Sequence, residues 1–256
     1  MKNVICLWSC PRNVSTALMY SFAQRSDTEV FDEVLYAHYL SESKVDHPGR
    51  KDVLESQETD GDKVIENIIL KNRSKISFHK LMTHFLVNLN TNFLKKVQNI
   101  IFIRNPEEII YSYNKVISNP TMEDIGVKKQ YELYHNLIKM GNIPLVLDSK
   151  YLLQNPELIL KKICILLEIP FQKKMLTWKK GGIKEDGIWA KYWYKNIHNL
   201  AITYVLIVPI FFTFFHLLPL HVFLVPIRTI PLIFVLLSYV LGYWPNPLHL
   251  LYYANY

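Results

Sequence analysis

Two segments with the same pattern constrain the fold of this chain more than any other feature. Residues 7–20 read LWSCPRNVSTALMY, and residues 100–113 read IIFIRNPEEIIYSY. Each begins as an apolar, strand-like run, reaches a basic residue and continues through a turn into an amphipathic helical pattern. A helix that begins at the end of a parallel strand presents free N–H groups and the positive end of its dipole. The pair predicts a small domain whose ligand carries anionic groups at both ends.

Strand-like and helix-like patterns alternate along residues 1–199. The most continuous apolar run, at 99–105, is the expected central strand, because parallel strands are covered on both faces. Alternating strands and helices form right-handed βαβ units, which predicts a three-layer, P-loop-like α/β fold: a parallel sheet flanked by helices. Ligands of such sheets bind at the carboxyl ends of the strands, where both basic motifs fall. Strands are expected at 3–9, 29–36, 75–80, 99–105 and 143–149.

Capping residues predict where several helices begin. Asn105 stands before a proline and a glutamate, a combination that suits the N-cap and first turn of a helix, and the same combination recurs at 155–157. Thr121 and Asp124 have the spacing of a capping box. The helix that they open is expected to run to Gly141, since glycine commonly ends helices.

Composition limits the classes of partner. The formal net charge of +7 is spread along the chain, with lysines interleaved among acids, which favours small anionic ligands or a membrane surface over a nucleic-acid track. The chain has no RRM, zinc-finger or basic-helix pattern, so nucleic acid is not an expected partner. The three cysteines are too few and too scattered for a disulfide framework or a metal cage. We therefore expect no metal, and a reducing, cytosol-facing compartment fits best.

Residues 200–256 form a hydrophobic tail with a composition of its own. After Lys195 the only formally charged side chain is Arg228, and the tail holds six of the chain's 13 prolines. The run from 200 to 227 exceeds the roughly 20 apolar residues that cross a bilayer, and membrane helices tolerate proline. A helical membrane anchor or hairpin is one interpretation; a buried hydrophobic lid and a poorly packing tail of altered reading frame are the others. If the tail enters a membrane, the lysines before it predict a cytosolic position for domain 1–199.

The loop at residues 10–16 differs from the Walker A motif of P-loop NTPases. It reads CPRNVST, whereas Walker A requires glycines and a lysine before the Ser or Thr. We expect Asn13 to take the left-handed conformation that glycine would supply, so that loop amides and the hydroxyls of Ser15 and Thr16 hold a phosphate where the helix begins. The second apolar strand ends in Arg104, not in the aspartate that holds magnesium in such enzymes. A kinase-type NTPase is therefore disfavoured, and a nucleotide bound without metal is predicted.

At these residues the chain resembles the sulfotransferase family. In that family a loop similar to PRSGTT holds the 5′-phosphosulfate of 3′-phosphoadenosine 5′-phosphosulfate, and a later strand that ends in arginine, with a serine eight residues on, holds the 3′-phosphate. Arg104 and Ser112 match this second site at the same spacing, and the resemblance covers roughly residues 1–199. The loop residues that it implies in donor binding are Pro11, Arg12, Asn13, Val14, Ser15 and Thr16, with Asn13 and Val14 where Ser and Gly are common.

Two further stretches extend the resemblance. WKKGGIKEDGIWAKYWY is similar to the C-terminal loop that closes over the 3′-phosphate, which implies donor binding by Lys179, Lys180, Gly181 and Gly182. DEVLYAHYL at 32–40, with GIWAKYWYKNIH, resembles a subgroup of uncharacterised sulfotransferase-like proteins, some of which carry aminotransferase-like names. No lysine stands in a context that favours pyridoxal phosphate chemistry. The aromatic residues of 188–194 either line an acceptor pocket or form an interfacial belt ahead of the tail.

The resemblance implies transfer of a sulfuryl group to an acceptor hydroxyl, which requires positive charge on the leaving oxygens and a base. Arg12 is expected to stabilise the leaving charge, because a guanidinium stays protonated and binds two oxygens. Glu33, near the end of the second strand, and His79, near the end of the third, are the alternative bases, since relatives use a glutamate or a histidine in similar places. Lys80 is a further candidate to contact the donor. The other hypothesis is a catalytically inactive, membrane-tethered nucleotide-binding or scaffold protein; the acceptor and the oligomeric state are not indicated.

Overall fold

A computed structural model of the chain describes residues 3–117, 120–199 and 202–203. The interpretation of the hydrophobic tail as a membrane anchor falls outside the described residues, apart from 202–203. Within the described part, no helix combines the length and the apolar character needed to cross a bilayer.

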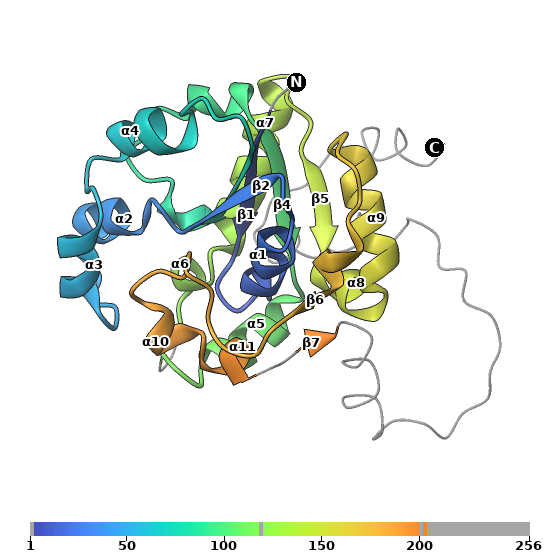
Figure 1. The fold of residues 1–256 in the computed structure, drawn as a ribbon. Helices are drawn as coiled ribbons and strands as arrows, with labels where there is room; N and C mark the ends of the chain where they lie inside the picture. Colours follow the sequence, from blue (N-terminus) through green and yellow to red (C-terminus); the bar gives the residue numbers. More distant parts are fainter. Residues whose placement is uncertain (1–2, 118–119, 200–201, 204–256) are drawn as a thin grey trace. The chain divides into compact units, whose positions relative to one another are not determined.

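The centre of the domain is a five-stranded parallel sheet with the strand order β2-β3-β1-β4-β5 (Figure 1). Because all five strands run the same way, their carboxyl ends lie along one edge. The prediction that 99–105 forms the central strand is wrong: β1 holds that place and β4 lies beside it. Both are interior strands with nearly continuous burial, so their apolar runs alone could not rank them. The strands are β1 (Val4–Ser9), β2 (Thr28–Asp32), β3 (Ile76–Met82), β4 (Gln98–Ile103) and β5 (Leu145–Asp148).

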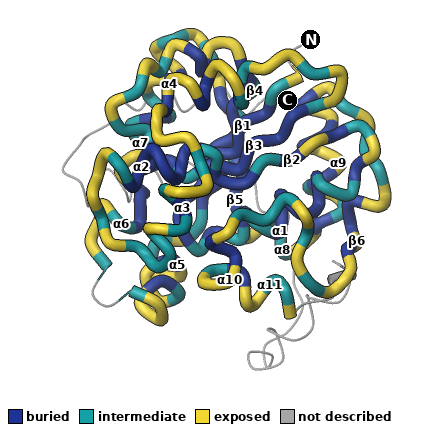
Figure 2. Tube along the Cα trace, turned by 60° about the vertical axis from the view of Figure 1, so that its left-hand side comes forward, coloured by how far each residue is buried: buried dark blue, intermediate teal, exposed yellow. Residues whose placement is uncertain are grey.

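Helices cover both faces of the sheet, which confirms the predicted three-layer α/β arrangement. Alternate residues of each strand enter two separate apolar clusters, as the two-residue period of a strand requires. In β1, Leu7 packs into the cluster with α1, α8 and α9, whereas Trp8 packs into the cluster with α2 and α7. Figure 2 shows the inner strands as buried and the outer turns of the covering helices as exposed. These helices are α1 (Ser15–Ala23), α2 (Tyr36–Ser43), α7 (Val127–Lys139), α8 (Ser149–Gln154) and α9 (Pro156–Leu166).

Shorter elements connect these layers. A two-stranded antiparallel pair, β6 with β7, lies apart from the main sheet. The short helices are α3 (Arg50–Ser56), α4 (Gly61–Val64), α5 (Pro106–Tyr113), α6 (Met122–Ile125), α10 (Ala190–Trp193) and α11 (Lys195–Asn199). The remaining elements are the π-helical turn η1 (Ile65–Ile69), the 3₁₀ turns η2 (Thr83–Phe85), η3 (Thr91–Lys96) and η4 (Lys173–Leu176), and the strands β6 (Thr177–Trp178) and β7 (Ile202–Thr203).

Two predicted elements are shorter than expected. The second strand ends at Asp32 instead of residue 36, because Glu33 turns into the left-handed region with φ 43°. The capping box of Thr121 and Asp124 is confirmed, but the helix that it opens is only α6. Gly126, with φ 67°, separates α6 from α7, so the single helix predicted to reach residue 141 is two helices.

Candidate functional site

A cleft of about 500 Å³ opens at the carboxyl edge of the sheet. Its walls come from the loop between β1 and α1, the end of β2, helix α5 and the segment around α10. This is the place where parallel sheets hold their ligands. The predicted site residues that line it are Pro11, Arg12, Asn13, Val14, Ser15, Thr16, Glu33, Arg104 and Ser112.

The loop before α1 has an unusual backbone. Arg12 and Val14, not the predicted Asn13, take left-handed conformations, with φ 61° and 57°. Val14 is the N-cap of α1, which has no side-chain cap and no acid in its first turn. The first amides of a helix lack intrahelical partners, and left-handed residues within a loop turn successive N–H groups toward one side to form an anion nest. The loop thus offers main-chain donors that no side chain has capped.

Asn13 has a different role from the one predicted. Its side chain is buried, and its Nδ2 donates to the carbonyl of Phe102 in β4. The same carbonyl also accepts from Gln130 Nε2 at 2.8 Å. The amide group therefore ties the loop to the neighbouring strand, and the left-handed conformations lie at the residues on either side of it.

Arg12 and the second basic motif meet in the cleft. Arg12 Nε donates to Ser112 Oγ at 3.1 Å, and Arg104 Nη1 donates to the carbonyl of Arg12 at 2.5 Å. Arg104 also pairs with Glu108, whose side chain is 57% exposed. Burial, and then the charge of Arg104, lower the pKa of the Arg12 guanidinium. Two guanidinium groups that repel each other within a cleft constitute a site that an anion would stabilise.

The start of α5 contrasts with that of α1. Asn105 Oδ1 accepts from the amide of Glu107 at 2.8 Å, so the predicted N-cap is confirmed, and Pro106 occupies the first turn. Glu107 and Glu108 place two acids beside the positive end of the dipole. The first turn of α5 is therefore capped by its own side chains. Binding of an anion here would depend on the side chains of Arg104 and Ser112.

Four buried polar side chains form a cluster behind the cleft. Lys80 Nζ donates to Asp32 Oδ1 at 2.7 Å and to Glu33 Oε1 at 2.5 Å. It also donates to the hydroxyl of Tyr194, which in turn lies 2.8 Å from Asp32 Oδ2. The register of the sheet sets this pairing, because Asp32 stands directly opposite Lys80. Glu33 and Tyr194 line the cleft, so the cluster connects its wall to strands β2 and β3.

The cluster controls the protonation of Glu33. Burial raises the pKa of its carboxyl, whereas the charge of Lys80 acts in the opposite direction. Burial lowers the pKa of Lys80, but the carboxylates of Asp32 and Glu33 outweigh this and leave it raised. A carboxylate on a cleft wall with a raised pKa is suited to accept a proton. The left-handed backbone of Glu33 costs about 1–3 kcal/mol, a kind of strain that concentrates at functional sites.

The structure places His79 away from the cleft. Its side chain is fully buried on the face of β3 opposite to Lys80, since consecutive strand residues point to opposite faces. The ring stacks on Phe31 at 4.6 Å, and neither ring nitrogen has a partner within the described structure. Burial lowers its pKa to about 3. A neutral, fully buried ring outside the cleft lining is poorly placed to act as the predicted base.

Residues 179–182 do not line the cleft either. Lys179 and Lys180 are exposed, and Gly181 takes φ 110°. The amide of Gly181 donates to the carbonyl of His198 at 3.0 Å, which ties this loop to α11. The structure therefore brings together the first two predicted donor motifs but not the third.

Several cleft residues were not identified from the sequence. Asp32 completes the polar cluster, and His47 and His84 line the cleft. The aromatic stretch at 188–194 was interpreted either as a pocket lining or as an interfacial belt, and the structure puts Trp193 and Tyr194 in the cleft wall.

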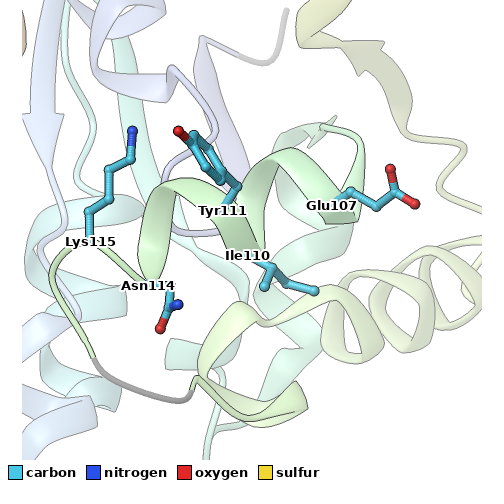
Figure 3. Close-up of a pocket in the computed structure, with 5 residues that line it drawn as sticks. All are labelled: Glu107, Ile110, Tyr111, Asn114 and Lys115. Atoms are coloured by element: carbon cyan, nitrogen blue, oxygen red, sulfur yellow. The ribbon is translucent and has the colours of Figure 1, made fainter.

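A second, shallower depression of about 490 Å³ follows helix α5. Figure 3 shows Tyr111 and Lys115 extending from one side of the helix, and Ile110 and Asn114 from the other. Lys115 Nζ lies 4.2 Å from the centre of the Tyr111 ring. Tyr111 and Lys115 also line the main cleft, so the depression continues its outer rim.

The described residues contain no group of three or more His, Cys, Asp or Glu side chains arranged to hold a metal ion. The three cysteines are buried and free. Burial raises the pKa of the Cys10 thiol, which keeps it protonated.

Comparison with protein families matches residues 1–204 to the family described as Sulfotransferase domain. Two Arabidopsis thaliana proteins, named Branched-chain-amino-acid aminotransferase-like protein 1 and 2, are 42% and 41% identical over 200 and 198 residues. The alignments cover 77% of this chain but only 36% and 35% of those proteins, so the chain spans about a third of the length of these curated relatives. Their names describe the whole relatives and assign no activity to this chain.

Solved structures share the fold at low sequence identity. The "Sulfotransferase Domain from the Synechococcus PCC 7002 Olefin Synthase" superposes with a TM-score of 0.50 and 16% identity, covering 95% of this chain and 95% of that chain. At this identity the likeness concerns the fold alone.

Proposed function

Because the chain belongs to the sulfotransferase domain family, we propose that it transfers a sulfuryl group from 3′-phosphoadenosine 5′-phosphosulfate to the hydroxyl group of an acceptor. The observation that carries this proposal is a single cleft lined by both basic motifs and by a buried carboxylate, Glu33. The two motifs suit the two anionic ends of the donor, and the carboxylate suits the acceptor.

The donor would bind in two parts. The uncapped amides and hydroxyls of the loop at 11–16 take the 5′-phosphosulfate, because this helix start has no competing acid. Arg104 and Ser112 take the 3′-phosphate, because charge-assisted bonds from a guanidinium compensate for the acids of α5. Arg12 reaches from the first motif to the second and offers its charge to the bridging region.

The transfer step needs one base and one stabilised leaving group. Glu33 accepts the proton of the acceptor hydroxyl while the acceptor oxygen forms its bond to sulfur. The bond between sulfur and the 5′-phosphate oxygen breaks, and adenosine 3′,5′-bisphosphate leaves with the additional negative charge. Arg12 stabilises that charge in a partly desolvated cleft, where such interactions are strongest. Lys80 and Asp32 hold the Glu33 carboxylate in place.

The proposal is tested by following label from radiolabelled donor into a mixture of hydroxyl acceptors with the full chain. We expect Glu33→Gln to lower the transfer rate by about 1,000-fold, a typical loss for a general base, and to bind the donor as the parent does. The matched control is His79→Phe, which fills the same buried site without the unpartnered nitrogens and should keep transfer within about twofold.

Retained transfer in Glu33→Gln together with lost transfer in His79→Phe would refute the assignment of Glu33 as the base. If the parent chain binds the donor saturably but transfers label to no acceptor, the domain is a nucleotide-binding module without turnover. If neither donor nor bisphosphate binds, the proposed function itself fails.

A further inference from the structure

Helix α9, on the outside of the domain (Figure 1), carries apolar side chains on the side that faces away from the core. Its buried positions, such as Leu160 and Ile163, pack into one of the two apolar clusters. Leu158 and Ile165 share the opposite side, because seven residues make about two turns of a helix, and they are 45% and 73% exposed. Leu166 beside them is 62% exposed. Three exposed apolar side chains on one helix differ from the singly scattered ones that are common on protein surfaces.

Lysines surround these apolar side chains. Residues 156–180 contain six lysines and only two glutamates, so the segment is strongly basic. Lys162 stands between the apolar positions on the outward side of α9, and Lys173 and Lys174 begin η4, which packs against α9. All three lysines are exposed, and no ion pair within the described residues involves them. Their charges are therefore available to an anionic partner.

Contacts between the two segments place these lysines beside α9. Lys161 Nζ lies 2.7 Å from Glu157 Oε1 in the first turn of α9 and 5.5 Å from the centre of the Phe171 ring. The hydrogen bond and the charge of Lys161, and further the charge of Lys173, lower the pKa of Glu157. The apolar and basic side chains thus belong to one surface. This surface, the α9 face, consists of Leu158, Lys162, Ile165, Leu166, Lys173 and Lys174.

We propose that the α9 face lies on a membrane surface that contains anionic lipids. The lysines pair with the lipid head groups, and the three apolar side chains enter the boundary between head groups and acyl chains. The α9 face is part of the folded domain and lies outside the described lining of the cleft. The proposal is therefore independent of the proposed function.

Other partners would satisfy only part of this face. A soluble polyanion would pair with the lysines and leave the apolar side chains in water. An apolar protein partner would cover the leucines and the isoleucine but would enclose lysines without counter-charges. A second copy of the chain, docked through the same face, would bring the lysines of both copies together, and like charges repel. An anionic lipid surface accommodates both kinds of side chain.

The connection to the hydrophobic tail supports a membrane as the partner. Strand β6 follows η4 directly and pairs with β7, with Thr177 opposite Thr203. Residues 204–256 continue the chain from β7, and Arg228 is their only formally charged side chain. The most apolar part of the sequence is therefore joined to the domain next to the lysines of η4.

A fluorophore on the α9 face tests the proposal in the full chain. Ile165→Cys places a reactive thiol on this face, whereas the three native cysteines are buried. An environment-sensitive dye on this thiol should shift its emission to shorter wavelength with vesicles of phosphatidylcholine and about 30% phosphatidylserine, and not with phosphatidylcholine alone. Asn67→Cys, exposed in η1 on the other side of the sheet, is the matched control and should respond to neither.

Removal of the lysines should weaken this response. In the labelled chain, Lys173→Gln with Lys174→Gln should raise the concentration of anionic vesicles needed for half of the shift by about 30-fold, the effect of two lysines near an anionic surface. Lys128→Gln with Lys129→Gln, two exposed neighbours on α7, is the matched control and should change it by less than about twofold.

The remaining outcomes overturn the proposal. Vesicle binding through the tail alone would leave the dye at residue 165 in water with both kinds of vesicle. An equal shift with neutral and anionic vesicles would show that the lysines take no part. A shift that grows with protein concentration in the absence of vesicles would assign the α9 face to contact between copies of the chain.

Discussion

The two strand-to-helix turns of this domain have similar sequence patterns and opposite local structures. At the first, helix α1 begins after a left-handed Val14, with no side-chain cap and no acid in its first turn. At the second, helix α5 begins after Asn105, whose side chain accepts from Glu107, and carries two acids in the first turn. The first turn keeps its main-chain donors available, whereas the second has already satisfied part of its own.

The difference shows that a helix N-terminus alone does not make an anion site. The dipole is present in both helices, but Glu107 and Glu108 oppose an anion at α5. Any affinity there must come from Arg104 and Ser112, which reach the cleft beside Arg12. The expectation that both motifs act through their helix starts therefore stays a prediction for α1, and at α5 it requires the side chains of Arg104 and Ser112 as well.

Among the changes proposed here, an acid added to the first turn of α1 should alter the affinity for the bound anion most, because it makes this turn resemble that of α5. We expect Thr16→Glu to bind adenosine 3′,5′-bisphosphate about 100-fold more weakly than the isosteric Thr16→Gln, because like charges about 5 Å apart at a protein surface repel by a few kcal/mol. Calorimetry measures the affinities. Thermal unfolding supplies the control, since an acid near a helix N-terminus stabilises the helix.

At α5 the corresponding change should matter little. Glu107→Gln removes one acid from the capped turn and should alter the affinity by less than about threefold. Equal sensitivity of the two helices would mean that the bound anion does not distinguish the capped turn from the uncapped one.

A smaller effect is expected for the backbone of the first turn. Val14 has φ 57°, a conformation that a β-branched residue adopts only under strain. Val14→Gly should therefore be more stable than Val14→Ala by about 1 kcal/mol in the free energy of unfolding, because both remove the side chain and only glycine relieves the strain. Chemical denaturation measures the difference. A more stable alanine variant would show that the left-handed turn is absent in solution.

The features that were predicted correctly from the sequence depend on residues close to one another along the chain. Strand β1, the N-cap at Asn105 and the capping box at Thr121 follow from side chains within a few positions, and the structure confirms them. Asn13 shows where this reasoning ends. Its local propensity favoured a left-handed turn, but Arg12 and Val14 take that conformation, and the Asn13 side chain bonds to the carbonyl of Phe102, which lies 89 residues away.

The candidate site divides in the same way. Arg104 and Ser112 were found because their spacing across one strand-to-helix turn matches that of the sulfotransferase family, and this spacing is local. The polar cluster was not found, because Lys80 meets Asp32 only through the register of β2 against β3, and Tyr194 joins them from the end of the domain. His79 was an alternative to Glu33 as the base because relatives use a histidine in a similar place. The alternation of the strand turned it to the other face, where it packs on Phe31.

The central claim is that the two motifs hold the two ends of one nucleotide, and a cycle of two ligands and one variant tests it most directly. Calorimetry on the full chain compares adenosine 3′,5′-bisphosphate with adenosine 5′-phosphate for the parent and for Arg104→Met, with the exposed Lys161→Met on α9 as the control. We predict that Arg104→Met weakens the bisphosphate about 30-fold, as loss of a charge-assisted contact does, and weakens the monophosphate less than twofold. Equal losses for the two ligands, or no loss for either, would contradict the claim.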